Sequence, residues 1–272
     1  MSHIRRVWAG MLTRNTNNSG TNSPIVLIVN EDGTDRLHNT FSDTPQEDQE
    51  QGQANIYEVD VAANNITPEN LNNSSIRVGI RGNDAWRPEH FVVWGERATG
   101  GAILPLAIET DLTLQISTDR SEGNLSFPLR LAGLGNVGMR INRLLMLMTT
   151  ANVRDAGTNS RVTLQISSGG GIIVDFDLPD TPQDEQERGQ ANLYFVPVNT
   201  PFTKRGLNPS GISLTIGGTD AWMPASFFLF GLDDAAGRPE ALVPLVHIRN
   251  WNLGQLSTDS SEGVSSVTLP QV

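Results

Sequence analysis

Two acidic segments of nearly the same sequence are the strongest candidates for chemistry in this chain. Residues 43–57 read DTPQEDQEQGQANIY, and residues 180–194 read DTPQDEQERGQANLY. Calcium takes about six to eight oxygen ligands from carboxylates, amide carbonyls and backbone on a loop that can surround the ion. A Gly-Thr-Asn turn before each segment could add an asparagine oxygen. The calcium ligands expected on this basis are Asn22, Asp43, Asp48, Asn159, Asp180 and Asp184.

A second interpretation of the same segments is purely structural. Acidic loops are commonly solvated, and an aspartate such as Asp43 or Asp180 often fixes a turn through side-chain hydrogen bonds to the backbone. The carboxylate spacing does not follow the EF-hand pattern. Both the calcium site and the solvated turn therefore remain open.

A tryptophan motif is also present twice, as Asp-Ala-Trp at 84–86 and at 220–222. A tryptophan beside a turn can be an exposed anchor for lipid, sugar or a protein partner. It can equally pack across the end of a sheet, and the strands expected shortly after Trp86 and Trp222 favour packing. Trp251 is a third candidate binding residue without a counterpart in the first half, where Asp111 falls nearest to it.

Motifs for catalysis are weak in this sequence. With no cysteine there is no thiol nucleophile, disulfide or cysteine-bound metal. The four histidines share no motif, and neither G-x-S-x-G nor H-E-x-x-H occurs. Residues 133–138 read GLGNVG, but a dinucleotide fingerprint must lie between a strand and a helix. The following residues 141–150 align with 4–13, a predicted first strand, so a linker is favoured and no enzyme is expected.

Internal repetition predicts the domain organisation. Besides the acidic and tryptophan motifs, Gly-Thr-Asn-Ser occurs at 20–23 and 157–160, and Ser-Thr-Asp-x-Ser-Glu-Gly occurs at 117–123 and 257–263. The order is the same in both halves. We therefore expect two copies of one domain, at 1–132 and 139–272, joined by the glycine-rich linker 133–138.

Each copy has the pattern of β-structure, in short β-branched or aromatic runs bounded by Asn, Gly, Pro and Ser. Seven or eight such runs in each copy predict an all-β fold of two tandem antiparallel β-sandwiches. The segment 168–171, SGGG, is expected to be a hairpin turn. The predicted strands are 25–29, 56–61, 76–80 and 91–94 in the first copy, and 162–166, 172–176, 193–196, 212–216 and 227–230 in the second.

Charge and hydropathy limit the partners. The chain has 272 residues with 19 basic and 30 acidic groups, which gives a formal net charge of −11. Nucleic acid and bare anionic lipid both need a basic face, so nucleic acid is not expected as a partner and anionic lipid is not expected to bind unaided. No apolar stretch is long enough for a transmembrane segment. The N-terminus lacks a classical signal peptide, which indicates a cytoplasmic protein or export by a non-classical route.

The residues around the second Gly-Thr-Asn turn resemble a known family. Residues 149–166, TTANVRDAGTNSRVTLQI, are similar to the opening of a PLAT domain, the lipoxygenase-homology β-sandwich. Arg188-Gly189 and the Asp220–Pro224 motif resemble later parts of that family. The resemblance implies a module that docks to membranes or protein partners, in some members through calcium at loop tips. Asn22 and Asn159 stand where many members have aspartate, which implies weaker calcium binding.

The function expected from these features is a non-catalytic tandem binding protein that docks to a protein partner or a lipid surface, with calcium as the cofactor if there is one. A structural protein that assembles as a homo-oligomer or in a larger particle is an alternative. Carbohydrate binding through exposed tryptophans is another.

Overall fold

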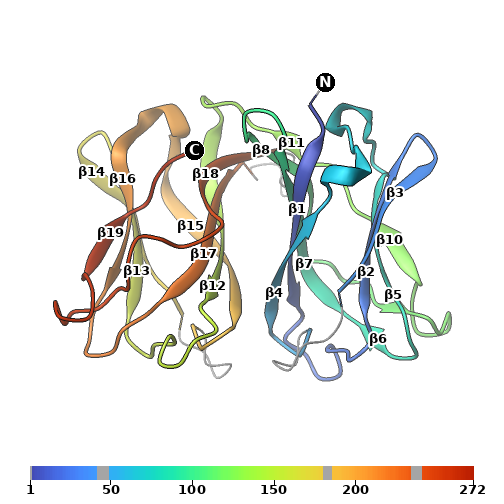
Figure 1. Ribbon diagram of the computed structural model, residues 1–272, viewed down its shortest axis with the longest axis horizontal. Helices are drawn as coiled ribbons and strands as arrows, with labels where there is room; N and C mark the ends of the chain where they lie inside the picture. The colour runs from blue at the N-terminus through green and yellow to red at the C-terminus, as the bar shows by residue number, and fades with distance from the viewer. Residues whose placement is uncertain (1, 42–48, 180–185, 234–240) are drawn as a thin grey trace. The chain divides into compact units, whose positions relative to one another are not determined.

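The computed structural model describes residues 2–41, 49–179, 186–233 and 241–272, and it is all-β (Figure 1). The chain divides into two compact units, Met1–Leu134 and Gly135–Val272. The division lies inside the predicted linker 133–138. The helices of the described ranges are three short 3-10 turns, and none of them could cross a membrane.

Unit 1 is a sandwich of two antiparallel four-stranded sheets. One sheet has the order β4-β1-β7-β8 and the other β10-β5-β2-β3, while β6 and β9 form a small ribbon. Its elements are β1 (Ile4–Thr13), β2 (Ile25–Glu31), β3 (Thr34–Phe41), β4 (Ala54–Asp60), η1 (Ala62–Asn64), η2 (Pro68–Asn70), β5 (Ile76–Ile80), β6 (Ala85–Trp86), β7 (Pro88–Arg97), β8 (Ile103–Glu109), β9 (Ile116–Ser117), β10 (Ser126–Pro128) and β11 (Gly133–Leu134).

Unit 2 has a similar internal arrangement, with sheet orders β15-β12-β17-β18 and β14-β13-β16-β19. Figure 1 shows these two sheets as separate layers. The elements are β12 (Arg140–Thr150), β13 (Val162–Ser168), β14 (Gly171–Asp177), β15 (Ala191–Thr203), η3 (Lys204–Gly206), β16 (Leu207–Ile216), β17 (Pro224–Leu232), β18 (Ala241–Ile248) and β19 (Ser266–Thr268).

Alternating side chains from the two sheets of each unit form its core. In unit 2, for example, Leu144, Met146 and Met148 of β12 point to the same side and pack in one buried cluster with Leu164 and Ile166 of β13. Every second residue of a strand lies on one face, so this alternation is what a sandwich requires. Many of the core residues lie in the strands that the sequence predicted.

The predicted strands all lie within or largely overlap observed ones, and 76–80 matches β5. The SGGG turn is confirmed, because Gly169 and Gly170 have φ of 59° and 85° between β13 and β14. The segment after GLGNVG is strand β12 rather than a helix. A dinucleotide fingerprint needs the N-terminus of a helix at that point, so the linker interpretation is the one that fits.

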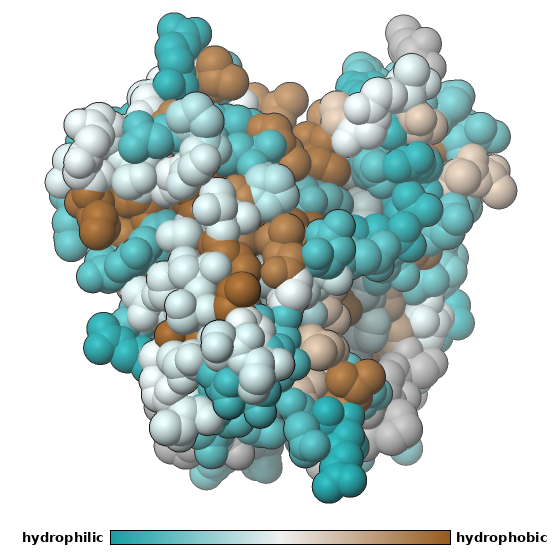
Figure 2. Space-filling model, turned by 60° about the vertical axis from the view of Figure 1, so that its left-hand side comes forward, coloured by the Kyte–Doolittle hydropathy of each residue, from teal (hydrophilic) through white to brown (hydrophobic). Residues whose placement is uncertain are grey.

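One face of the molecule is shown in Figure 2. Hydrophilic and intermediate residues cover most of this face, with hydrophobic residues in groups among them. Val153 and Ile172 are two large apolar side chains that are at least half exposed. Single exposed apolar residues are normal on soluble surfaces, so they carry no functional argument of their own.

One end of each sandwich collects the repeated motifs. In unit 2, β12, β14, β16 and β18 all run toward this end, and the connections after them contain the Gly-Thr-Asn turn, the acidic segment, Asp-Ala-Trp and Ser-Thr-Asp-x-Ser-Glu-Gly. We call it the motif end; it is the lower end of unit 2 in Figure 1. The strand order of unit 1 places the same motifs at one end of that sandwich.

Candidate functional site

The Gly-Thr-Asn turn is rigidly built at the motif end of both units. In unit 2 the hydroxyl of Thr158 is buried and accepts a hydrogen bond from the backbone N–H of Ser160 at 3.0 Å. In unit 1 the hydroxyl of Thr21 accepts from Ser23 at the same distance. A threonine that bonds the backbone two residues ahead stabilises a turn without a sheet ladder. The asparagine between them is exposed in both units.

An aspartate from the tryptophan motif holds this turn in place. Asp220 accepts from the backbone N–H of Asn159 at 3.2 Å and from that of Ala221 at 2.9 Å. In unit 1 Asp84 accepts from the backbone N–H of Asn22 at 3.4 Å and from the hydroxyl of Thr21 at 3.0 Å. From the sequence, Asp84 and Asp220 were noted only as part of the Asp-Ala-Trp motif. Their repetition was the available signal, but repetition alone does not show that they fix the turn.

The two tryptophans of the motif are core residues. Trp86 and Trp222 are completely buried, and each indole N–H donates to a buried threonine hydroxyl, Thr13 at 2.9 Å and Thr150 at 3.0 Å. An exposed anchor is therefore wrong for Trp86 and Trp222 in this structure. The reason is that a buried indole needs both apolar contacts and one acceptor, and the end of the sandwich supplies both.

Trp251 differs from the other two tryptophans. It is partly buried against the core, and its indole N–H donates to the carbonyl of Gly254 at 2.6 Å. Its backbone N–H bonds the carbonyl of Ala225, and in unit 1 the N–H of Leu112 bonds that of Glu89 in the same way. Leu112, and not Asp111, is therefore the residue that corresponds to Trp251.

A buried glutamine lies within each acidic segment, and sequence reasoning missed it. Gln49 is fully buried with φ of 59°, its backbone N–H donates to Asn55, and its side-chain amide donates to the hydroxyl of Tyr57. Its side-chain carbonyl oxygen is buried without a hydrogen-bond partner in the described structure. In unit 2, Gln186 donates to the hydroxyl of Tyr194 at 2.7 Å. The repeated spacing of Gln, Asn and Tyr was the available signal.

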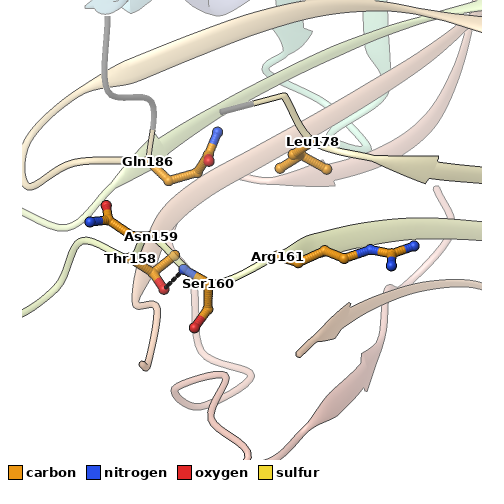
Figure 3. Close-up of a pocket in the computed structure, with 6 residues that line it drawn as sticks. All are labelled: Thr158, Asn159, Ser160, Arg161, Leu178 and Gln186. Carbon is orange, nitrogen blue, oxygen red and sulfur yellow. Dashed lines mark hydrogen bonds between the residues drawn. The ribbon is translucent and has the colours of Figure 1, made fainter. Parts of the chain in front are cut away.

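A pocket of about 230 Å³ lies at the motif end of unit 2. Figure 3 shows the side chains of Asn159 and Gln186 on one side of it and those of Leu178 and Arg161 on the other. The lining residues are Thr158, Asn159, Ser160, Arg161, Leu178 and Gln186. Most of the polar atoms at the turn side are amide or hydroxyl oxygens and nitrogens, so the pocket can coordinate a hard cation or hydrogen-bond a polar group.

The predicted calcium ligands are only partly described. Asn22 and Asn159 lie on exposed turns at the motif ends, and no hydrogen bond to either side-chain amide is found within the described ranges. Asp43, Asp48, Asp180 and Asp184 lie outside the described residues. The described part of the site thus consists of the turn asparagine and the buried glutamine within each acidic segment.

Two carboxylates of unit 2, those of Asp177 and Asp259, are held by hydrogen-bond donors. Arg161 contacts Asp177 with an N–O distance of 2.6 Å. The hydrogen bonds from Arg161 and from the hydroxyl of Thr163 lower the pKa of Asp177 below its ordinary value. At Ser257–Gly263, the side-chain hydroxyl and the backbone N–H of Ser261 lower the pKa of Asp259. These carboxylates are therefore charged at neutral pH.

The fold defines the class of this protein as a β-sandwich protein whose repeated polar motifs lie at the ends of its sandwiches. No protein-family model matches the chain, and no curated protein does. Among solved structures, the alpha toxin from Clostridium absonum is similar at 18% identity with a TM-score of 0.38. The match covers 49% of this chain and 32% of the toxin, so the chain spans about a third of the toxin's length.

Proposed function

We propose that this chain is a non-catalytic binding protein whose two PLAT-like sandwiches dock through their motif ends to a protein partner or a lipid surface. The observation that carries the proposal is the convergence of every repeated motif on one end of each sandwich. Binding residues are commonly placed on loops that a rigid scaffold positions.

The hydrogen bonds of the motif end support this proposal. Asp220 fixes the backbone of Asn159, and Trp222 anchors the same loop in the core through Thr150. The asparagine side chain is consequently presented from a rigid turn without being used by the fold itself. A preorganised polar group loses little conformational entropy when a ligand binds, and this favours affinity.

Calcium is the cofactor that we propose for this end. Asn159 and Gln186 offer neutral amide oxygens beside the pocket, and in the sequence the acidic residues Asp180, Asp184 and Glu185 stand between Leu178 and Gln186. A calcium ion would link the acidic chain to an anionic lipid or protein surface that its net charge of −11 otherwise repels. Two such ends on one chain would increase avidity if both engage one surface.

Calorimetry with calcium, followed by sedimentation with phosphatidylcholine–phosphatidylserine vesicles, tests this function. We expect a calcium-dependent heat and calcium-dependent pelleting, both weakened by Asn159→Ala and Asp180→Asn. Asp175→Asn, which removes one charge from β14, is the matched control and should leave both unchanged. Heat without pelleting favours a protein partner. No heat and no pelleting under either condition would contradict calcium and lipid docking together.

The other functions that the sequence left open have less support. Carbohydrate binding was expected to use exposed tryptophans and loop carboxylates, and the burial of Trp86 and Trp222 leaves Trp251 as the tryptophan available for that role. No particular contact among the described residues favours self-assembly or a catalytic role over docking.

A further inference from the structure

We propose that Glu89, His90 and Asp111 of unit 1 form a binding site for a divalent cation of the zinc class. One ligand atom from each of these three side chains lies within 4.8 Å of the other two. The set contains one imidazole and two carboxylates and lies outside the Gly-Thr-Asn site described above. It lies at the motif end of unit 1, where β8 ends and β7 begins, but none of its three residues belongs to a repeated motif.

The pairing of β7 with β8 brings these residues together. Phe91 pairs with Glu109, so the antiparallel register places Glu89 opposite Asp111 just beyond the end of β8. The backbone N–H of Leu112 bonds the carbonyl of Glu89 at 2.9 Å and fixes this juxtaposition. The three side chains are therefore held by backbone geometry rather than by a flexible loop.

The charge arrangement at this point favours a cation. Two carboxylates that face each other on adjacent strands repel and are destabilising. No ion pair within the described ranges includes Glu89 or Asp111. Arg14 comes close, but its guanidinium donates to the backbone carbonyl of Leu112. A bound divalent cation would neutralise both carboxylates at once.

The imidazole selects the type of metal. His90 is 8% exposed, and its Nδ1 accepts a hydrogen bond from the backbone N–H of Asp111 at 3.2 Å. Because Nδ1 accepts this hydrogen bond, its lone pair points toward Asp111, and a metal bound at Nδ1 would take the place of the Asp111 N–H as its partner. Zinc binds imidazole nitrogen and carboxylate oxygen at about 2.0–2.2 Å, whereas calcium and magnesium prefer all-oxygen sites. Asp111 is exposed, which leaves the remaining coordination position to water.

Unit 2 provides an internal comparison. The register of β17 with β18 places Ala225, Ser226 and Asn250 at the three corresponding positions. The hydroxyl of Ser226 forms a hydrogen bond of 2.7 Å with Thr149. The same local backbone thus folds without any of the three ligands, and the site is specific to unit 1.

The test is zinc titration of the full untagged chain by calorimetry. We expect about one zinc ion per chain. The variant E89A/H90S/D111N, which copies the residues of unit 2, should lose this binding while circular dichroism shows an unchanged fold. His38→Ser, which removes an exposed histidine on β3, is the matched control and should bind zinc as the native chain does.

Copper(II) electron paramagnetic resonance supplies a second measurement. A bound copper ion should show coupling to one imidazole nitrogen, and His90→Ser should abolish that coupling. Retention of zinc binding by E89A/H90S/D111N, or loss of it in His38→Ser, would overturn the assignment. So would the absence of zinc binding by the native chain, or its displacement by an equal concentration of calcium.

Discussion

Thr150→Val should destabilise unit 2 through one specific hydrogen bond. The hydroxyl of Thr150 is the acceptor for the indole N–H of Trp222 at 3.0 Å, and both residues are almost completely buried. Valine preserves the shape of threonine but cannot accept a hydrogen bond. The indole N–H is then left buried without a partner, which costs about 1–3 kcal/mol of the free energy of unfolding.

This cost can be converted into a melting temperature. For a domain of the size of Gly135–Val272, each kcal/mol corresponds to roughly 3–6 °C, so a loss of about 2 kcal/mol lowers Tm by roughly 6–12 °C. Scanning calorimetry should place this shift in the transition of one unit. Thr13→Val, which removes the acceptor of Trp86, should produce the same kind of shift for unit 1.

Two control variants separate the loss of the indole hydrogen bond from other effects of the Thr150→Val substitution. Thr200→Val, at an exposed position of β15, should change the free energy of unfolding by less than about 0.5 kcal/mol. In a Trp222→Phe background, Thr150→Val should have nearly no further effect, because no N–H remains to be left unpaired. A full effect of Thr150→Val in that background would show that the indole hydrogen bond is not the cause.

Three further perturbations test other parts of the structure. Gly157→Ala should lower the free energy of unfolding of unit 2 by about 1–3 kcal/mol in urea, because the new Cβ would lie 3.1 Å from the Arg188 backbone nitrogen. Gly217→Ala is the control: its Cβ would meet no atom within 4 Å, so the free energy of unfolding should change little. Lys204→Met should lower the free energy of unfolding of unit 2 by about 1–3 kcal/mol, since the Lys204 ammonium donates to the carbonyls of Pro244 and Val272. Equal denaturation midpoints for the variant and the native chain would contradict this. Ser261→Ala should raise the pKa of Asp259 in an NMR titration by removing its hydroxyl donor. Because the pKa of Asp259 in the folded protein lies below its ordinary value, this carboxylate stabilises the fold at pH values above the ordinary pKa. That stabilisation is lost as the pH falls through the folded pKa. An unchanged pKa of Asp259 in Ser261→Ala would refute the hydroxyl as the cause.

The fold was largely predictable because a sandwich repeats simple local rules. Short β-branched runs between turn residues were enough to locate β5 and β13. Strand β3 was missed because most of its residues are polar and exposed, so it lacks the buried alternation that identifies a strand. It is specified instead by the tight turn at Asp32 and Gly33, with φ of 50° and 81°, and by its pairing with β2.

The candidate site was less predictable, and for a physical reason. Repetition drew attention to the acidic segments and to Trp86 and Trp222, but it does not separate residues that maintain the fold from residues that bind a ligand. Burial makes that distinction and cannot be read from one sequence. The group Glu89, His90 and Asp111 was missed for the opposite reason, because its members are not repeated and only strand register brings Asp111 to the other two.

The two kinds of position therefore lead to different functional conclusions. Asp220, Thr158 and Trp222 are repeated in unit 1, and each already has a hydrogen-bond role that stabilises the motif end. Their repetition is sufficiently explained by the fold. Asn159 is repeated and exposed, and its side-chain amide has no such role within the described ranges, so its repetition is what the proposed calcium site would explain. Where the units differ, as at His90 and Ser226, the fold accommodates both residues, so the proposed zinc site can be tested by substitution without loss of the fold.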